Sequence, residues 1–236
     1  MFGPMRQLAY GICLMGLSCF GGVGAAVAER TVFILDASSS METELNGETR
    51  LIVAKAAVRS AIGTIHRGSP EHEVGLVSFY DGCWVHPMAP VAPLASNRHA
   101  LLQHVAGLAT RKYGHTPIAR SLEIAAEQLE GNGGSIILVS DGEETCDKTR
   151  DMCEIAQDLR RQNVELKVHF IALTLNDAQR EAMLCIPKTT GGTFVAVETS
   201  ADLKDAMQIA AEMAAQSSWD RCYDNRGGFL HRWCGE

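Results

Sequence analysis

The sequence lacks the excess of basic charge that a nucleic-acid-binding surface needs. Its 236 residues include 21 lysines and arginines against 28 aspartates and glutamates, which gives a formal net charge of -7. This balance repels a phosphate backbone, and we find no basic stripe in the chain that would offset it. DNA and RNA are therefore not expected partners.

Signature motifs of the common hydrolases and nucleotide-binding enzymes are also missing. Beyond residue 28 the chain has no Gly-x-Ser-x-Gly, Ser-x-x-Lys or His-Glu-x-x-His motif and no phosphate-binding loop. The histidines show no spacing typical of metal ligands. A serine hydrolase that uses Ser38 or Ser40 with a histidine remains an alternative, because catalytic triads are defined by geometry. We expect the protein not to be an enzyme.

The N-terminus has the features of an export signal. Arg6 precedes an apolar stretch over residues 8–20, and the small residues Ala26 and Ala28 form a cleavage pattern. We expect a signal peptide over residues 1–28 and a periplasmic or secreted protein. The alternatives are lipidation at Cys19 and retention of the segment as an anchor, the one case in which we expect the membrane as a partner.

Cysteine pairs without the Cys-x-x-Cys spacing of redox enzymes are expected after export. Two of the eight cysteines lie in the leader, and the remaining six form an even set in a compartment that permits disulfides. The sequence leaves the connectivity open. Short separations along the chain favour Cys146 with Cys153 and Cys222 with Cys234, which leaves Cys83 with Cys185.

The hydrophobic pattern predicts an α/β fold. Continuous apolar runs indicate strands covered on both faces, as in a parallel sheet, and segments of helical spacing separate them. The expected strands are 31–35, 74–80, 135–140, 166–173 and 193–197. The expected helices lie around 51–65, 118–129, 155–159, 178–186 and 200–216. We therefore predict a doubly wound, Rossmann-like, mostly parallel sheet with helices on both faces.

Three further features complete this prediction. Residues 84–94 are interrupted by prolines, which favours an antiparallel edge strand beside the 74–80 strand. Pro187 is expected to end its helix early. The predicted domain spans residues 29–216, and residues 217–236 form a disulfide-stapled C-terminal tail.

Oxygen-bearing side chains gather where strands are expected to end. Asp36, Ser38 and Ser40 follow the first strand at alternate positions, and together they offer hard oxygen donors suited to a small divalent cation. Asp141 follows another strand, and Thr116 precedes a helix. Because ligands collect at the carboxyl ends of strands in such sheets, these five residues predict one metal site.

The order of the segments DASSS, GHTPI and SDG resembles the metal-ion-dependent adhesion site of von Willebrand factor type A domains. The resemblance covers about residues 30–216, and the SDGEETC and LCIPKTTGG segments are similar to an exported bacterial subgroup. It implies that Ser38, Ser40 and Thr116 bind the metal directly or nearly so, and that Asp36 and Asp141 act directly or through water. His115 departs from the family, which usually has a small residue there.

Magnesium is the expected cation, with manganese or calcium as alternatives, because Mg²⁺ prefers six oxygen ligands and keeps water where protein ligands run out. A coordination position then stays open for an Asp or Glu of a protein partner. We expect metal-dependent protein binding as the function. The alternative is a metal-independent scaffold stapled by disulfides.

Overall fold

The computed structural model describes residues 29–214, and a six-stranded sheet in the order β5-β4-β1-β6-β7-β8 forms its centre. Neighbouring strands are parallel, except that β5 is antiparallel to β4. The strands of this sheet are β1 Arg30–Asp36, β4 Glu73–Asp81, β5 Trp84–Pro93, β6 Gly134–Ser140, β7 Leu166–Leu173 and β8 Phe194–Val197. A short hairpin of β2 (Glu44–Leu45) and β3 (Glu48–Thr49) stands apart from it. The predicted sheet and its antiparallel edge are confirmed.

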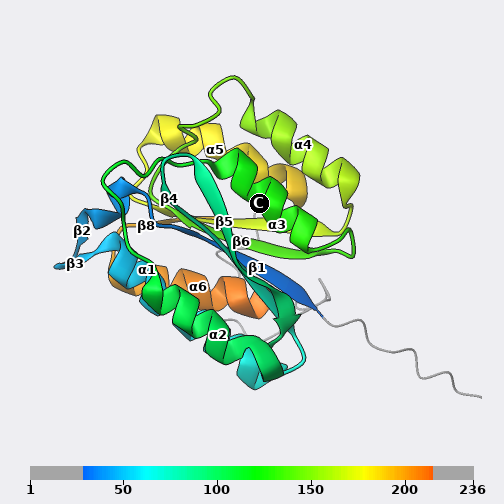
Figure 1. Ribbon diagram of the computed structural model, residues 1–236. Coiled ribbons are helices and arrows are strands. Elements are labelled where there is room, and N and C mark those ends of the chain that lie inside the picture. Colours follow the sequence, from blue (N-terminus) through cyan, green and yellow to red (C-terminus); the bar gives the residue numbers. More distant parts are fainter. Residues whose placement is uncertain (1–28, 215–236) are drawn as a thin grey trace, which may run out of the picture.

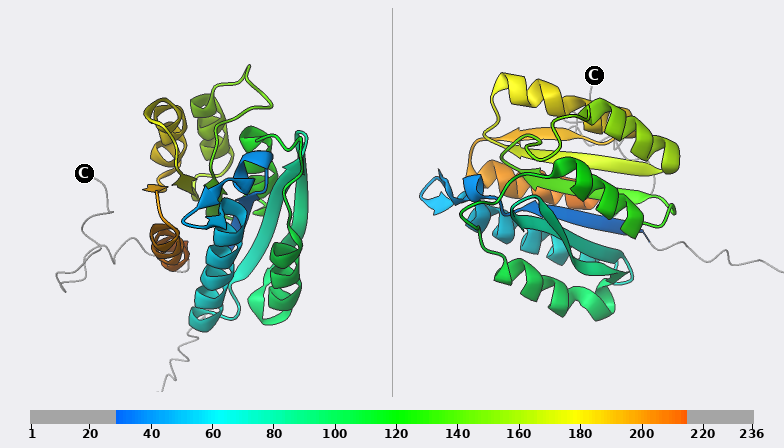
Figure 2. Two further views of the ribbon diagram at one scale, coloured as in Figure 1. Left: turned by 90° about the vertical axis from the view of Figure 1, so that its left-hand side faces the viewer. Right: turned by 45° about the horizontal axis from the view of Figure 1, so that its top comes forward.

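Helices cover both faces of the sheet (Figure 1). One layer contains α1, α2 and α6, and the opposite layer contains α3, α4 and α5, as the two turned views also show (Figure 2). Their bounds are α1 Arg50–Gly68, α2 Leu94–Gly107, α3 Ile118–Gln128, α4 Met152–Gln162, α5 Asp177–Thr190 and α6 Ser200–Ala214, with a 3-10 helix η1 at Ser39–Glu42. None of the helices within residues 29–214 has the length and apolar character needed to cross a membrane. The doubly wound α/β class is therefore confirmed.

The continuous apolar strands result from two separate cores. In β1, Phe33 and Leu35 belong to the core beneath α1, α2 and α6, whereas Val32 and Ile34 belong to the core beneath α3, α4 and α5. All four side chains are fully buried. Because successive side chains point to opposite faces, a strand covered on both sides must be apolar at every position.

Two helical segments differ from the sequence-based prediction. Helix α2 was not predicted, because its buried residues are only Leu94, Leu101 and Val105 and its pattern is weakly amphipathic. The early end expected at Pro187 is wrong, since α5 continues to Thr190. Proline removes one backbone donor, but its carbonyl still accepts the N–H of Gly192 at 2.9 Å, so the last turn closes normally.

The turn after α5 packs directly on β7, and this contact makes Gly192 irreplaceable. A Cβ at this position would lie 1.9 Å from the carbonyl oxygen of Val168, a backbone atom of the central sheet. We expect Gly192→Ala to lower the free energy of unfolding by about 3 kcal/mol, because the strand cannot move aside. Urea denaturation measures the loss. Gly68→Ala is the control, since nothing lies within 4 Å of its Cβ position, and equal stability of the two variants would contradict the prediction.

Candidate metal centre

Asp36 and Asp141 lie at the carboxyl ends of two adjacent strands. Asp36 is the last residue of β1, and Asp141 directly follows β6, which pairs with β1 in parallel. The chain runs from β1 to β4 on one side and returns to β6 on the other. The two carboxylates thus flank the point where the strand order reverses, the usual ligand-binding crevice of such sheets.

Asp36 is held by hydrogen bonds from the turn after β1 and from the end of β6. Its Oδ1 accepts the backbone N–H of Ser38 at 2.8 Å, and its Oδ2 accepts the hydroxyl of Ser140 at 2.5 Å. Asp36 and Ser140 are fully buried. The carboxylate is therefore fixed at the base of the crevice, with its orientation set by the turn that follows β1.

A chain of hydroxyl contacts joins the loop after β1 to Asp141. The Oγ atoms of Ser38 and Ser40 lie 3.1 Å apart, and Ser40 donates to Oδ1 of Asp141 at 2.6 Å. Ser38 is buried and Ser40 is exposed. These three side chains, predicted from separate segments of the sequence, are brought together with Ser40 at the solvent-facing side.

Thr116 reaches the same crevice from the loop before α3. Its backbone N–H donates to the hydroxyl of Thr145 at 2.8 Å, and its carbonyl accepts the N–H of Thr145 at 3.1 Å. A Cβ at Gly142 would lie 3.5 Å from the Thr116 hydroxyl oxygen. The hydroxyl of Thr116 therefore lies against the residue that follows Asp141.

Arg50 is a charged neighbour that sequence reasoning missed. Its Nη1 lies 2.6 Å from Oδ2 of Asp141, whose side chain is fully buried, and the Arg50 side chain is only 17% exposed. Arg50 begins α1, after the β2–β3 hairpin, and nothing in its local sequence marks it as part of the site. Its guanidinium partly neutralises the charge of Asp141.

The environment of Asp36 favours its protonated form. Burial raises the pKa of the Asp36 carboxyl from its usual value of 3.8 to about 7, and the negative charge of Asp141 adds to this rise. The hydrogen bonds from Ser140 and Ser38 oppose the rise without cancelling it. A buried carboxylate of this kind gains from a nearby cation, which would compensate for the lost hydration.

The disulfide pairing differs from the one expected from chain separation, and one of the two bonds joins loops near the crevice. Cys83 bonds to Cys146, and Cys153 bonds to Cys185. The expected pairs Cys146–Cys153 and Cys83–Cys185 are therefore wrong, because the fold brings the β4–β5 turn against the loop after β6. The expected pair of Cys222 and Cys234 lies outside the described residues.

Glu144 orders the loop that follows Asp141. Its carboxylate accepts the backbone N–H groups of Cys146 at 2.6 Å, Asp147 at 2.9 Å and Ala119, in the first turn of α3, at 2.7 Å. Glu144 is thus a structural acceptor and not a free charge at the rim. Glu42 and Glu143, by contrast, are exposed.

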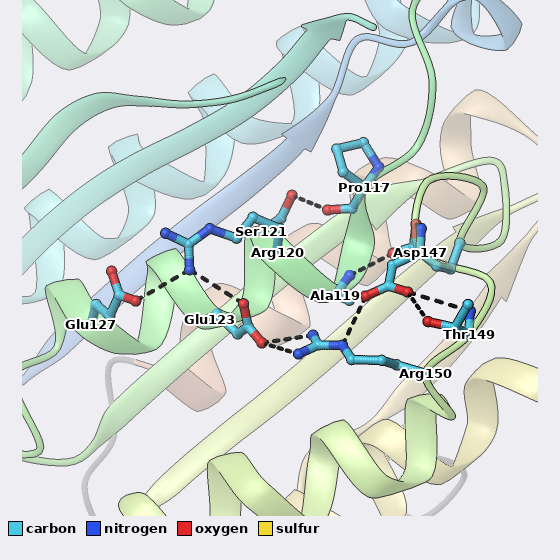
Figure 3. Close-up of polar contacts among 10 residues, drawn as sticks. Pro117, Ala119, Arg120, Ser121, Glu123, Glu127, Asp147, Thr149 and Arg150 are labelled. Carbon is cyan, nitrogen blue, oxygen red and sulfur yellow. Dashed lines mark hydrogen bonds and ion pairs between the residues drawn. The ribbon is translucent and has the colours of Figure 1, made fainter. Parts of the chain in front are cut away.

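Arg150 anchors the far end of this loop to α3 (Figure 3). Its guanidinium contacts Glu123 at 2.6 Å and Asp147 at 3.0 Å, and Asp147 also accepts the Thr149 hydroxyl at 2.7 Å. These partly exposed pairs contribute little individually. Together with the Glu144 contacts, they attach the loop to the helix that Thr116 precedes.

The resulting donor set is rich in hydroxyls. It contains two carboxylates and three hydroxyl groups, from the residues predicted as ligands: Asp36, Ser38, Ser40, Thr116 and Asp141. Over residues 29–214, no group of three or more histidine, cysteine, aspartate or glutamate side chains could hold a metal. An all-oxygen set of this composition suits Mg²⁺ or Mn²⁺ and does not suit zinc.

Comparison with known proteins supports one family. The family model of the von Willebrand factor type A domain matches residues 31–144. No curated protein matches the sequence.

Solved structures share the fold at low identity. The conserved hypothetical protein BatB from Bacteroides thetaiotaomicron is 18% identical with a TM-score of 0.62, over 80% of this chain and 99% of that chain. The SpRpn10 VWA domain is 16% identical with a TM-score of 0.62, over 76% of this chain and 94% of that one. The pilus adhesin SpaC from Lactobacillus rhamnosus GG is 15% identical with a TM-score of 0.67, over 81% of this chain and 31% of SpaC. These similarities show the fold.

Proposed function

We propose that this chain, which contains a von Willebrand factor type A domain, binds a divalent cation at the carboxyl end of its sheet and thereby binds a protein partner. Such domains generally mediate protein-protein interaction. The residues that would hold the cation are Asp36, Ser38, Ser40, Thr116 and Asp141. The observation that carries the proposal is the continuous contact from Ser38 through Ser40 to Asp141.

The chemistry of the donors supports magnesium. Two desolvated carboxyl groups share one arginine, so ionisation of Asp36 leaves a negative charge in the crevice that a cation would balance, and hydroxyl oxygens complete a hard-oxygen set. When bound, the cation would supply a Lewis-acidic position for a carboxylate oxygen of the partner. The protein's own contribution is to hold its oxygens in place before binding, through the contacts of Ser140 and Thr145.

Export is the second part of the proposal. Two disulfides within residues 29–214 fit a periplasmic or extracellular protein. The proposed signal peptide, residues 1–28, and the proposed tail, residues 217–236, lie outside the described residues. N-terminal sequencing of the protein from the periplasmic and secreted fractions tests both the cleavage after Ala28 and the proposed localisation.

A metal titration tests the proposed site. The purified chain is titrated with Mg²⁺, Mn²⁺ and Ca²⁺ by calorimetry, and thermal unfolding is followed with and without chelator. We expect saturable binding and a melting temperature that rises with metal concentration, since a ligand of the folded state stabilises it. Heat and melting curves indistinguishable from the chelator control would refute the site and favour the metal-independent scaffold.

The affinity for magnesium is expected to depend on pH. Because the pKa of the Asp36 carboxyl is raised to about 7, protons compete with the cation, and binding should be about tenfold weaker at pH 6 than at pH 8. In the metal-free chain, folding stability depends on pH in the opposite direction. A raised folded-state pKa contributes stability at low pH, and this contribution is lost as the pH rises through about 7. Calorimetry across this range measures the affinity, and a pH-independent value would contradict the assignment of Asp36.

Arg50 is expected to lower the affinity for the cation. Its guanidinium is paired with Asp141 at 2.6 Å, so Arg50→Gln removes a positive charge beside the site and should tighten Mg²⁺ binding by about tenfold. The same variant should melt earlier without metal, because Asp141 loses its counter-ion. Arg67→Gln is the matched control in the last turn of the same helix. Unchanged or weaker binding by Arg50→Gln alone would show that Arg50 positions Asp141 for the metal.

A further inference from the structure

Two large aromatic side chains are exposed close to the proposed metal site. Trp84 is 74% exposed and Tyr113 is 71% exposed, although most large apolar side chains of the domain are buried. Trp84 begins β5, after the β4–β5 turn, and Tyr113 lies in the loop between α2 and α3. Exposed tryptophan and tyrosine are the residues most enriched at binding hot spots.

Backbone contacts hold these two segments side by side. The N–H of Gly82 donates to the carbonyl of Tyr113 at 3.2 Å, and the N–H of His115 donates to the carbonyl of Gly82 at 2.9 Å. Trp84 and Tyr113 are thus presented from adjoining segments. The disulfide between Cys83 and Cys146 ties the same turn to the loop after Asp141.

The loop that carries Tyr113 also touches the loop after β1. The carbonyl of Gly114 accepts both the N–H of Ser39 at 3.3 Å and its hydroxyl at 3.1 Å. A Cβ at Gly114 would lie 3.1 Å from the Cα of Ser38. Tyr113 therefore directly precedes a residue in contact with the proposed ligand loop, so a molecule bound at the metal would lie near it.

Positive charge accompanies the aromatic side chains. Arg111 lies over the ring of Tyr80 at 5.9 Å, and the ammonium group of Lys112 lies 5.5 Å from the centre of the Tyr113 ring. Both cations are exposed, on a chain whose net charge is -7. Exposed acids also lie in the neighbourhood: Asp81 in β4, Glu42 in η1, Glu44 in β2 and Glu143 in the loop after β6.

We infer that Trp84, Tyr113, Arg111 and Lys112 form a second contact surface, here called the aromatic-cationic platform, for an acidic segment of the protein partner. One carboxylate of the segment would bind the metal, a second would pair with Arg111 or Lys112, and an apolar side chain would pack on the two rings. This inference rests on the proposed function. The platform selects acidic segments with an adjacent apolar residue over those that offer a carboxylate alone.

Rigidity favours this use of the platform. The Gly82–Gly114 bridge and the Cys83–Cys146 disulfide fix the segments before any partner arrives. Binding would then order few additional residues, which reduces the entropy lost on association. Tryptophan and tyrosine contribute large contact areas with few rotatable bonds.

A display library of random short peptides is the probe. Peptides are selected on the purified chain in Mg²⁺, and their dissociation constants are measured by fluorescence polarisation. The measurements are repeated with Trp84→Ser/Tyr113→Ser and with Arg111→Gln/Lys112→Gln. Val164→Ser is the matched control, because Val164 is 63% exposed and precedes β7, at the amino end of that strand and not at the carboxyl end where the proposed site lies. Thr116→Ala and chelator test the metal separately.

The expected result is enrichment of peptides with two acidic residues and a neighbouring apolar one. Their affinity should fall about tenfold or more in each platform variant, with the affinity for Mg²⁺ unchanged and Val164→Ser equal to the unaltered chain. Peptides that bind both platform variants normally but are lost with chelator would overturn the platform and leave the metal function standing. Peptides whose affinity with chelator and for Thr116→Ala equals their affinity for the unaltered chain in Mg²⁺ would overturn the metal function. A selection without enrichment would count against both proposals.

Discussion

Ser40→Ala is expected to weaken magnesium binding by about a hundredfold, since it removes one proposed ligand and the donor that orients Asp141. The Ser40 hydroxyl lies 2.6 Å from Oδ1 of Asp141 and 3.1 Å from the hydroxyl of Ser38. Because Ser40 is exposed, its truncation should change stability little in the metal-free chain. Thr116→Ala should weaken the affinity to a similar extent. Isothermal calorimetry with Mg²⁺ and Mn²⁺ gives the dissociation constants.

The neighbouring Ser39 provides a matched control. Ser39 is also exposed, but its hydroxyl donates to the carbonyl of Gly114 at 3.1 Å and contributes no atom to the proposed ligand set. Ser39→Ala removes the same atom one position away and should keep the affinity of the unaltered chain within about threefold, because only one neutral hydrogen bond is lost. If Ser39→Ala and Ser40→Ala lose the same affinity, the effect is one of loop stability and the ligand assignment fails.

Removal of the Cys83–Cys146 disulfide is the second large expected effect. The bond closes 63 residues, so Cys83→Ser/Cys146→Ser should lower the free energy of unfolding by about 4 kcal/mol through the greater freedom of the unfolded chain. In a domain of this size, the melting temperature should fall by about 10 °C. Magnesium affinity should fall as well, because the loop after Asp141 loses its attachment to the β4–β5 turn. Calorimetric melting with and without Mg²⁺ measures both effects.

The second disulfide separates these two effects. Cys153 and Cys185 connect α4 with α5 across 32 residues, and neither helix carries a proposed ligand. Cys153→Ser/Cys185→Ser should therefore cause a loss of stability of similar size, about 4 kcal/mol, with magnesium affinity unchanged. Equal affinities in the two double variants would show that the Cys83–Cys146 bond has no role at the site.

The strands were predictable because burial on both faces leaves a plain signal. The expected strand at 166–173 matches β7 residue for residue, and the motifs at the strand ends resemble those of von Willebrand factor type A domains, whose family model matches residues 31–144. Helix α2 left no such signal. Its first residue follows Pro93, and the polar residues Asn97, Arg98 and His99 interrupt its apolar pattern. Packing against α1 and β5, rather than its own sequence, accounts for this helix.

The site was predictable only in part, for a related reason. Side chains that follow strand ends in order, such as Asp36 and Asp141, can be assigned to one edge from the topology of the fold. Arg50 and Thr145 reach the crevice through tertiary contacts between loops, and no local pattern marks them. The cysteine pairing failed likewise, because separation along the chain does not measure distance across a folded sheet.

The prolines of β5 restrict how a partner can approach. β5 and β8 are the outermost strands of the six-stranded sheet described over residues 29–214. Pro87, Pro90 and Pro93 deprive β5 of backbone donors, and β8 is only four residues long. An incoming strand would find little to pair with at either border, so the sheet resists extension by another polypeptide and the aggregation that such extension causes. Recognition through loop side chains is thereby the route that this architecture leaves open.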